Sequence, residues 1–165
     1  MSLRLLAVSG SLRSRSVNQD ILQYLHSVSA DRVSWDFYDE LDQLPAFNPD
    51  VTEDLEAVAR WKDRLAKADG VVICSPEYVF AMPGALKNAL DWTVSGMVWE
   101  GKPTFPVTAS LSGEKAHESL LLVLRTLGAS ITEDRLIPNA RTTWAGQQEE
   151  LKEMMERFLS TLNQS

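Results

Sequence analysis

Strand-like and helix-like hydrophobic patterns alternate five times along this chain. Short apolar runs, such as residues 3–8 and 71–74, are each followed by a longer segment in which apolar residues recur every three or four positions. This alternation predicts an α/β fold with a doubly wound parallel sheet, because each right-handed crossover between parallel strands places a helix on one face. Gly70 and Pro76 bound the run Val71–Cys74, which is typical of a strand buried on both faces.

The sequence predicts one domain spanning residues 1–165, since no repeat, low-complexity tract or linker interrupts the pattern. We expect strands over 3–8, 32–38, 71–74, 105–110 and within 130–137, and helices from near Val17, from Thr52 with Asp54 and Glu56 in the first turn, over 85–94, over 116–127 and over 151–162. Ligands of such sheets bind at the carboxyl ends of the strands, where the strand order reverses. For the order 2-1-3-4-5, the loops at 9–18 and 75–84 meet there.

Composition excludes several classes of function. The 165 residues are 44% hydrophobic and carry a net charge of −7, which is unfavourable for non-specific binding to nucleic acid. No run approaches the 18 or so apolar residues of a membrane span, and the short apolar N-terminus does not resemble a signal peptide. Cys74 is the only cysteine, and His26 and His117 lie far apart, so we expect neither a disulfide nor a metal site. These features favour a cytoplasmic protein.

The first loop reads SGSLRSRSVN over residues 9–18 and directly follows the first strand. Hydroxyl groups, two arginines and the N-terminus of a helix together suit a phosphate dianion. The loop lacks both the Walker pattern GxxxxGK[ST] and the dinucleotide pattern GxGxxG. An alternative remains open, in which Ser14 or Ser16 only caps the helix and both arginines lie in water.

The second loop lies within SPEYVFAMPGALKNALDW, residues 75–92. Pro76 and Pro83 stiffen it and leave backbone N–H groups that no helix or sheet uses. Tyr78 and Phe80 add flat apolar surfaces. Such a loop suits the polar edge of a ring, although a plain strand-to-helix connection is the alternative.

These segments resemble one known family. SGSLRSRSVN, the tripeptide PEY at 76–78, PGALKNALDW at 83–92 and GKP at 101–103 are similar, in order and spacing, to the NADPH-dependent FMN reductases. The resemblance spans nearly the whole chain. It implies a flavodoxin-like, five-stranded doubly wound sheet of order 2-1-3-4-5 in a three-layer αβα arrangement, with FMN and NADPH (or NADH) as cofactors.

The resemblance also implies roles for individual residues. The FMN phosphate would be held by Ser11, Arg13, Ser16 and Asn18, the flavin ring would be lined by Pro76, Glu77, Tyr78 and Val79, and its far side would be closed by Ser110, Ser112 and Gly113. No side chain is expected to act as a catalytic acid or base, because the cofactor supplies the chemistry. The methionines of the last helix are expected in the core.

Three positions depart from the family pattern. Val79 stands where the family usually has asparagine, and Ala81 replaces a small or hydroxyl residue. The third loop, SLSGEKAHES over 110–119, has one glycine, Gly113, where the family has several. These departures bear on flavin affinity and on access to the ring.

The leading hypothesis is an NAD(P)H-dependent flavin reductase that passes electrons to a quinone, an azo compound, a metal oxyanion or free flavin. The alternative is a flavodoxin-type electron carrier without NAD(P)H turnover, which the net charge of −7 permits. A phosphate-sensing receiver domain is excluded, since it needs an acidic cluster after the first strand and an aspartate after the third. Ser9-Gly10-Ser11 and Ser75-Pro76-Glu77 stand there instead.

Apolar residues gather at the end of the third predicted helix: Trp92, Val94, Met97, Val98 and Trp99. A patch of this size at a surface predicts an interface, so we expect a homodimer or a homotetramer. The alternative is that these side chains pack within the monomer.

Overall fold

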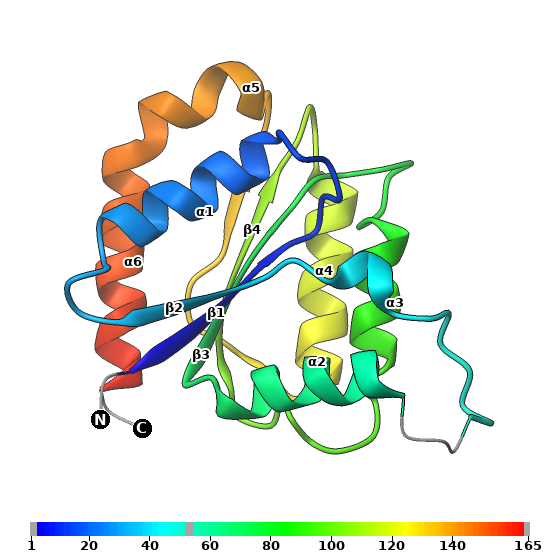
Figure 1. The fold of residues 1–165 in the computed structure, drawn as a ribbon. Coiled ribbons are helices and arrows are strands. Elements are labelled where there is room, and N and C mark those ends of the chain that lie inside the picture. The colour runs from blue at the N-terminus through cyan, green and yellow to red at the C-terminus, as the bar shows by residue number, and fades with distance from the viewer. Residues whose placement is uncertain (1–2, 52–54, 164–165) are drawn as a thin grey trace.

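The computed structural model describes residues 3–51 and 55–163, which form a parallel sheet between two layers of helices (Figure 1). The strand order is β2-β1-β3-β4-β5, with β6 also paired to β4, so the predicted order 2-1-3-4-5 is confirmed. The strands are β1 (Arg4–Ser9), β2 (Ser34–Tyr38), β3 (Gly70–Ser75), β4 (Pro103–Ala109), β5 (Ser130–Ile131) and β6 (Arg135–Ile137). The helices are α1 (Val17–Ser27), η1 (Leu41–Gln43), α2 (Glu56–Lys67), α3 (Gly84–Asp91), α4 (Glu114–Thr126), α5 (Ala140–Thr143), η2 (Trp144–Gln147) and α6 (Gln148–Leu162).

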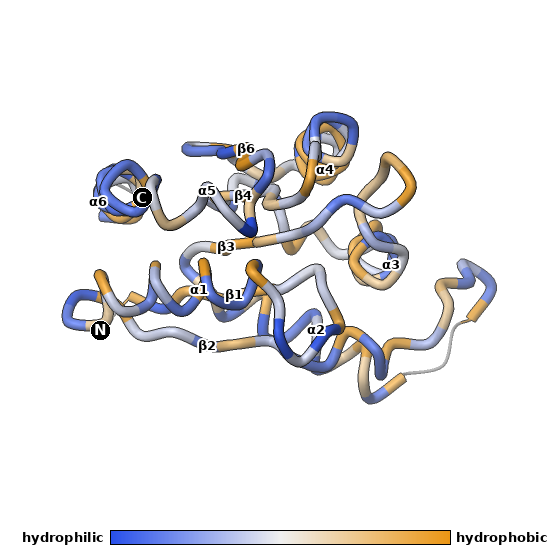
Figure 2. The backbone as a smooth tube through the Cα atoms, turned by 90° about the horizontal axis from the view of Figure 1, so that it is seen from above, coloured by the Kyte–Doolittle hydropathy of each residue, from blue (hydrophilic) through white to orange (hydrophobic). Residues whose placement is uncertain are grey.

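Each face of the sheet has its own hydrophobic core. Helices α1 and α6 cover one face, and α2, α3 and α4 cover the other (Figures 1 and 2). β3 is buried at every position and contributes Val72 and Cys74 to the first core and Val71 and Ile73 to the second. Burial on both faces explains why this strand is continuously apolar in sequence.

The fifth strand position differs from the prediction of one short strand. β5 pairs with the start of β4 and β6 with its end, so the edge of the sheet is interrupted between them. The backbone N–H and C=O groups of Thr104 and Thr108 in β4, and of Ser110 just after it, point toward β5 and β6. Because every second residue of a strand points the same way, the backbone nitrogen of Pro106 points toward this edge as well. Proline has no N–H to donate, so the ladder lacks a bond in the middle and the edge strand divides.

Other boundaries shift by a few residues. β2 begins at Ser34 instead of Arg32, and α3 ends at Asp91 instead of Val94. The predicted helix start at Thr52 lies outside the described residues, and α2 is observed from Glu56. The short helix α5 was not foreseen, because four residues carry no readable periodicity.

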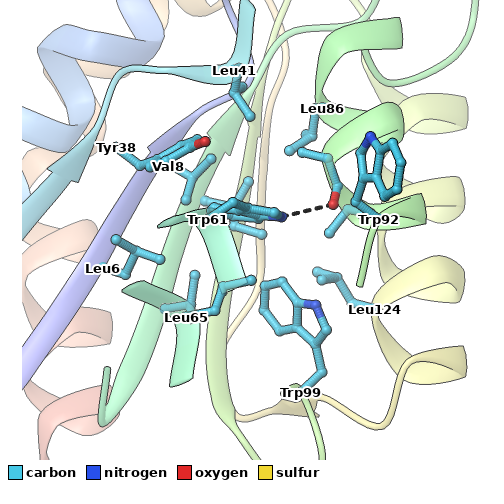
Figure 3. Packing of buried hydrophobic residues seen from close by; sticks show 14 of the residues in the cluster. Leu6, Val8, Tyr38, Leu41, Trp61, Leu65, Leu86, Trp92, Trp99 and Leu124 are labelled. Atoms are coloured by element: carbon cyan, nitrogen blue, oxygen red, sulfur yellow. Dashed lines mark hydrogen bonds between the residues drawn. The ribbon is translucent and has the colours of Figure 1, made fainter. Parts of the chain in front are cut away.

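The apolar cluster after α3 is mostly internal, which corrects the expectation of a surface patch. The Trp99 side chain is fully buried and the Trp92 side chain nearly so, and both belong to the core under α2, α3 and α4 (Figure 3). Trp99 donates its indole N–H to the Thr93 hydroxyl at 2.9 Å. Only Val94 and Met97 are widely exposed, so the two aromatic residues are part of the monomer's own packing.

The described ranges contain neither a membrane-spanning helix nor a cluster of metal-binding side chains. No helix there combines the length and the apolar character that crossing a membrane requires. No three His, Cys, Asp or Glu side chains among these residues are grouped so as to hold a metal ion.

Lys102, in the Gly-Lys-Pro segment before β4, stabilises the C-terminal end of α2. Its ammonium donates to the carbonyl oxygens of Leu65 at 2.9 Å and Ala68 at 2.6 Å, in the last turn and at the C-cap of the helix, where carbonyl groups lose their i+4 N–H donors. Burial lowers the pKa of Lys102, which is consistent with a partly dehydrated ammonium. The side chain therefore joins α2 to the start of β4.

Replacing Lys102 with methionine keeps most of the side-chain volume and removes both hydrogen bonds. We expect Lys102→Met to lower the free energy of unfolding by about 1–3 kcal/mol, because two carbonyl groups lose a charged donor. Urea denaturation measures this loss. Lys62→Met on α2 is the matched control, since the Lys62 ammonium forms no hydrogen bond or ion pair within residues 3–51 and 55–163. Equal losses in both variants would contradict the assignment.

Candidate functional site

The Ser9–Asn18 loop leaves β1 at the carboxyl edge of the sheet and enters α1. Gly10 lies so close to β3 that an added Cβ would approach the Ser75 hydroxyl oxygen to 2.3 Å, which only glycine avoids. The Ser16 hydroxyl accepts from the Gln19 N–H at 3.3 Å and caps α1, a role that the sequence gives as an alternative to phosphate binding. The loop is therefore held against β3 and at the start of the helix.

Two predicted polar ligands in this loop have partners within the protein. The buried Ser11 hydroxyl accepts from the Arg13 N–H at 3.3 Å. The buried Asn18 carbonyl oxygen accepts from the Cys74 thiol at 3.3 Å. Burial raises the pKa of that thiol, so Cys74 remains a neutral donor.

The second loop closes into a tight turn. Tyr78 and Ala81 exchange two backbone hydrogen bonds, of 2.8 and 3.0 Å, around Val79 and Phe80. Both central residues have positive φ, 51° and 57°, a conformation that β-branched valine strongly disfavours and that asparagine tolerates. The Val79 side chain is 96% exposed, and it is directed away from the protein. The departure from the family pattern at this position thus carries backbone strain.

The Glu77 carboxylate joins the second loop to the third. Its Oε1 accepts from the Ser112 hydroxyl at 2.7 Å and from the Gly113 N–H at 3.1 Å, and its Oε2 accepts from the Ala116 N–H at 3.2 Å. Gly113 is the N-cap of α4 and has no side chain to cap it, so Glu77 serves that end of the helix from a distant loop. The Ser112 hydroxyl is the main cause that lowers the pKa of Glu77.

Gly113 itself adopts φ of 95°, and an added Cβ would lie 2.9 Å from Leu136. The one glycine retained in the third loop therefore occupies a position that needs it. The Glu77 N–H also donates to the Ser110 hydroxyl at 3.1 Å. The two loops are consequently connected through both the backbone and the side chain of Glu77.

A cavity of about 720 Å³ opens at this edge of the sheet, between the loops that follow β1, β3 and β4. Eight of the predicted site residues line it: Ser11, Arg13, Ser16, Asn18, Pro76, Glu77, Tyr78 and Ser110. Val79, Ser112 and Gly113 are not among its lining residues. Ser112 and Gly113 instead hydrogen-bond to Glu77, so they affect the cavity only through that side chain.

Sequence reasoning missed one wall of the cavity. The segment after β6, from Asn139 to Thr142, lines it together with Arg15 and Leu111. No motif marks this segment. The segment follows the last strand of the sheet, and all parallel strands end at the same edge. That rule alone could have predicted that the segment lies beside the cavity.

A second cavity of about 490 Å³ lies on the other side of the first loop, toward β2. It shares Ser11 and Arg13 with the larger cavity but is also lined by Asp20, Asp39 and Asp42. Carboxylates repel a phosphate dianion. The larger cavity, whose only lining carboxylate is Glu77, is the better candidate for an anionic ligand.

Comparison with known proteins now identifies the family. The family model of NADPH-dependent FMN reductases matches residues 3–141, which include all three loops. The chain belongs to this family. FMN and NADPH are therefore the cofactors that the family implies.

The curated relatives include quinone and azo reductases. A 2-hydroxy-1,4-benzoquinone reductase from Burkholderia sp. is 43% identical over 107 residues, which are 62% of this chain and 58% of that protein. An NADPH azoreductase from Bacillus sp. (strain OY1-2) is 38% identical over 95 residues, 56% of this chain and 51% of that protein. The matched segments thus span somewhat more than half of these two relatives.

A solved structure shows the same fold along the whole chain. The flavoenzyme NAD(P)H:(acceptor) oxidoreductase FerB from Paracoccus denitrificans superposes with a TM-score of 0.83 at 24% identity and covers 98% of each chain. The flavodoxin-like architecture is therefore confirmed for this chain.

Glu77→Gln tests the connection between the two loops. We expect a loss of about 1–2 kcal/mol in the free energy of unfolding at neutral pH, because the amide replaces one acceptor with a donor that faces N–H groups. The folded-state pKa of Glu77 lies below the ordinary 4.5, so its stabilisation is complete above that value and is lost as the pH falls through the folded-state pKa. The difference from the parent protein should therefore shrink in acid.

Urea denaturation at several pH values measures this dependence. Glu114→Gln is the control, since Glu114 lies in the first turn of the same helix and its carboxylate forms no hydrogen bond or ion pair among the described residues. A pH-independent loss in Glu77→Gln would count against the carboxylate as its origin.

Proposed function

We propose that this protein is an NAD(P)H-dependent FMN reductase that passes electrons to a small acceptor. The observation that carries the proposal is the 720 Å³ cavity, bounded by the three loops at the carboxyl edge and lined by arginines whose guanidinium groups pair with no carboxylate of residues 3–51 and 55–163. Family membership supports the same activity. The quinone and azo reductases among the relatives support a small acceptor such as a quinone or an azo compound.

The residues present fit FMN. We assign the phosphate to Ser11, Arg13, Ser16 and Asn18, where hydroxyl and guanidinium donors meet the start of α1. We assign the ring to the Pro76–Val79 loop, in which Pro76, Glu77 and Tyr78 line the cavity, with Ser110 on its far side. Ser112 and Gly113 are assigned as positioning residues, since they hold the Glu77 carboxylate.

Bound FMN would supply the redox chemistry, accepting hydride from NAD(P)H and returning electrons to the acceptor. The chain itself would bind FMN, orient it and leave its ring accessible to substrates. The first loop fixes the charged end of the cofactor, and the Glu77 connection keeps the second and third loops at a constant separation. Tyr78 lines the cavity, and Phe80 lies in the turn that follows it. Both side chains are exposed and offer apolar surface to flat substrates.

A flavodoxin-type electron carrier is the second candidate, and one assay separates the two. We expect purified protein loaded with FMN to lose its visible flavin absorbance within seconds to minutes of adding NADPH without oxygen, and to regain it on adding a quinone. A carrier would bind FMN and stay oxidised in NADPH. Failure to bind FMN at all would overturn both candidates.

Arg13 is the sharpest test of the phosphate assignment. We expect Arg13→Ala to weaken FMN binding by about 1.5–3 kcal/mol, the worth of a hydrogen bond to a charged group. Riboflavin lacks the phosphate, so its affinity should not change. Titration of flavin fluorescence measures both affinities. An unchanged FMN affinity would remove Arg13 from the phosphate site.

We also propose that the protein is a homodimer or homotetramer acting in the cytoplasm. Trp92 and Trp99 belong to the core and do not support an interface. The support for an oligomer is the exposed apolar side chains of Val94, Met97 and the turn residues Val79 and Phe80. Sedimentation at micromolar concentration should show an oligomer that weakens in Met97→Glu. A monomer at these concentrations would contradict the proposal.

A further inference from the structure

Most arginines of this chain form ion pairs with carboxylates: Arg4, Arg32, Arg60, Arg64, Arg135 and Arg157. For Arg13, Arg15, Arg125 and Arg141, no ion pair or side-chain hydrogen bond joins the guanidinium to any residue within 3–51 and 55–163. Three of these four, Arg13, Arg15 and Arg141, line the same 720 Å³ cavity. Three of the four unpaired arginines of the described chain are therefore gathered at one place.

This gathering is notable in a chain of net charge −7, where carboxylates are abundant. The only carboxylate lining the cavity is Glu77, and both of its oxygens already accept hydrogen bonds from the third loop and α4. Three like charges around one cavity repel each other unless a counter-charge lies between them. A bound anion with more than one negative charge satisfies that requirement.

Arg141 reaches the cavity from a different wall than the other two arginines. Arg13 and Arg15 belong to the loop after β1, whereas Arg141 lies on α5, after β6 (Figure 1). Its backbone is anchored, because the Asn139 N–H donates to the Leu111 carbonyl at 3.0 Å and the Ala140 N–H donates to the Ser110 carbonyl at 2.9 Å.

The anchoring matters for affinity. Ala140 is buried in the core, so the short helix α5 is fixed to the third loop on one side and to the protein interior on the other. An arginine on a fixed backbone loses less conformational entropy on binding than one on a free chain end. Arg141 is thus held at the cavity while its guanidinium stays free for a ligand.

We propose that Arg141 is a phosphate-binding residue of this cavity, acting from a different element than the Ser9–Asn18 loop. The guanidinium fork would donate to two oxygens of a phosphate dianion. The proposal deepens the proposed function, on which it rests for the source of that phosphate. Two sources share this chemistry: the 5′-phosphate of FMN and a phosphate of the nicotinamide donor.

The experiment compares Arg141→Ala with Arg125→Ala, a matched control on α4 whose arginine is unpaired but does not line the cavity. If Arg141 binds the FMN phosphate, Arg141→Ala weakens FMN binding about tenfold or more and leaves riboflavin affinity unchanged. If it binds the donor, FMN affinity is unchanged and KM for NADPH rises by a similar factor at constant kcat. A rise for NADPH alone assigns the 2′-phosphate, and an equal rise for NADH assigns the pyrophosphate.

Arg141→Lys provides a further check, since it keeps the charge and should recover part of the loss. Parallel behaviour of Arg141→Ala and Arg125→Ala in FMN affinity, riboflavin affinity and KM would overturn the proposal while leaving the reductase assignment intact.

A last arm uses inorganic phosphate and flavin-free protein, so that it does not depend on the reductase assignment. Millimolar phosphate should raise the melting temperature of the parent protein more than that of Arg141→Ala at matched ionic strength. If the parent protein binds no FMN but shows this difference, the proposed function fails and the phosphate site stands. If FMN affinity, KM for the nicotinamide donor and the effect of inorganic phosphate are all the same in the two proteins, the phosphate site is wrong.

Discussion

The burial of β3 between β1 and β4 brings the ends of three strands to one edge of the sheet. β3 is covered by α1 and α6 on one face and by α2, α3 and α4 on the other, so its position is set by both cores at once. The loops after β1, β3 and β4 start from this common edge and enclose the cavity. Every distance within the site depends on that shared origin, because the loops themselves have little core of their own.

The loops are then held by polar contacts that are individually modest. Glu77 connects the second loop to the third and caps α4, and Gly10 lets the first loop approach Ser75. These contacts fix the shape of the cavity while leaving three arginines without internal partners. The arrangement resembles a preformed anion site, in which the ligand supplies the missing counter-charge.

The sequence segment that most specifically marks the family, PGALKNALDW, has mainly a structural role here. The Asn88 side chain accepts from the Phe47 N–H at 2.8 Å and donates to the Pro45 carbonyl at 2.9 Å. Trp92 donates its indole N–H to that same carbonyl at 2.7 Å. These bonds attach the segment after η1 to α3, so a motif that identifies the family does not by itself locate its cofactor.

The sequence by itself determined the alternation of elements, the strand order through its family resemblance, and eight of the residues that line the cavity. Those features are local, since they follow from hydrophobic periodicity and from short motifs within single loops. Only the tertiary structure decided the burial of Trp92 and Trp99, the capping of α2 by Lys102 and the placement of Arg141 at the same cavity as the Ser9–Asn18 loop. Each of these depends on contacts between segments far apart in the chain, and no local pattern encodes which partner a side chain will meet once the sheet has assembled.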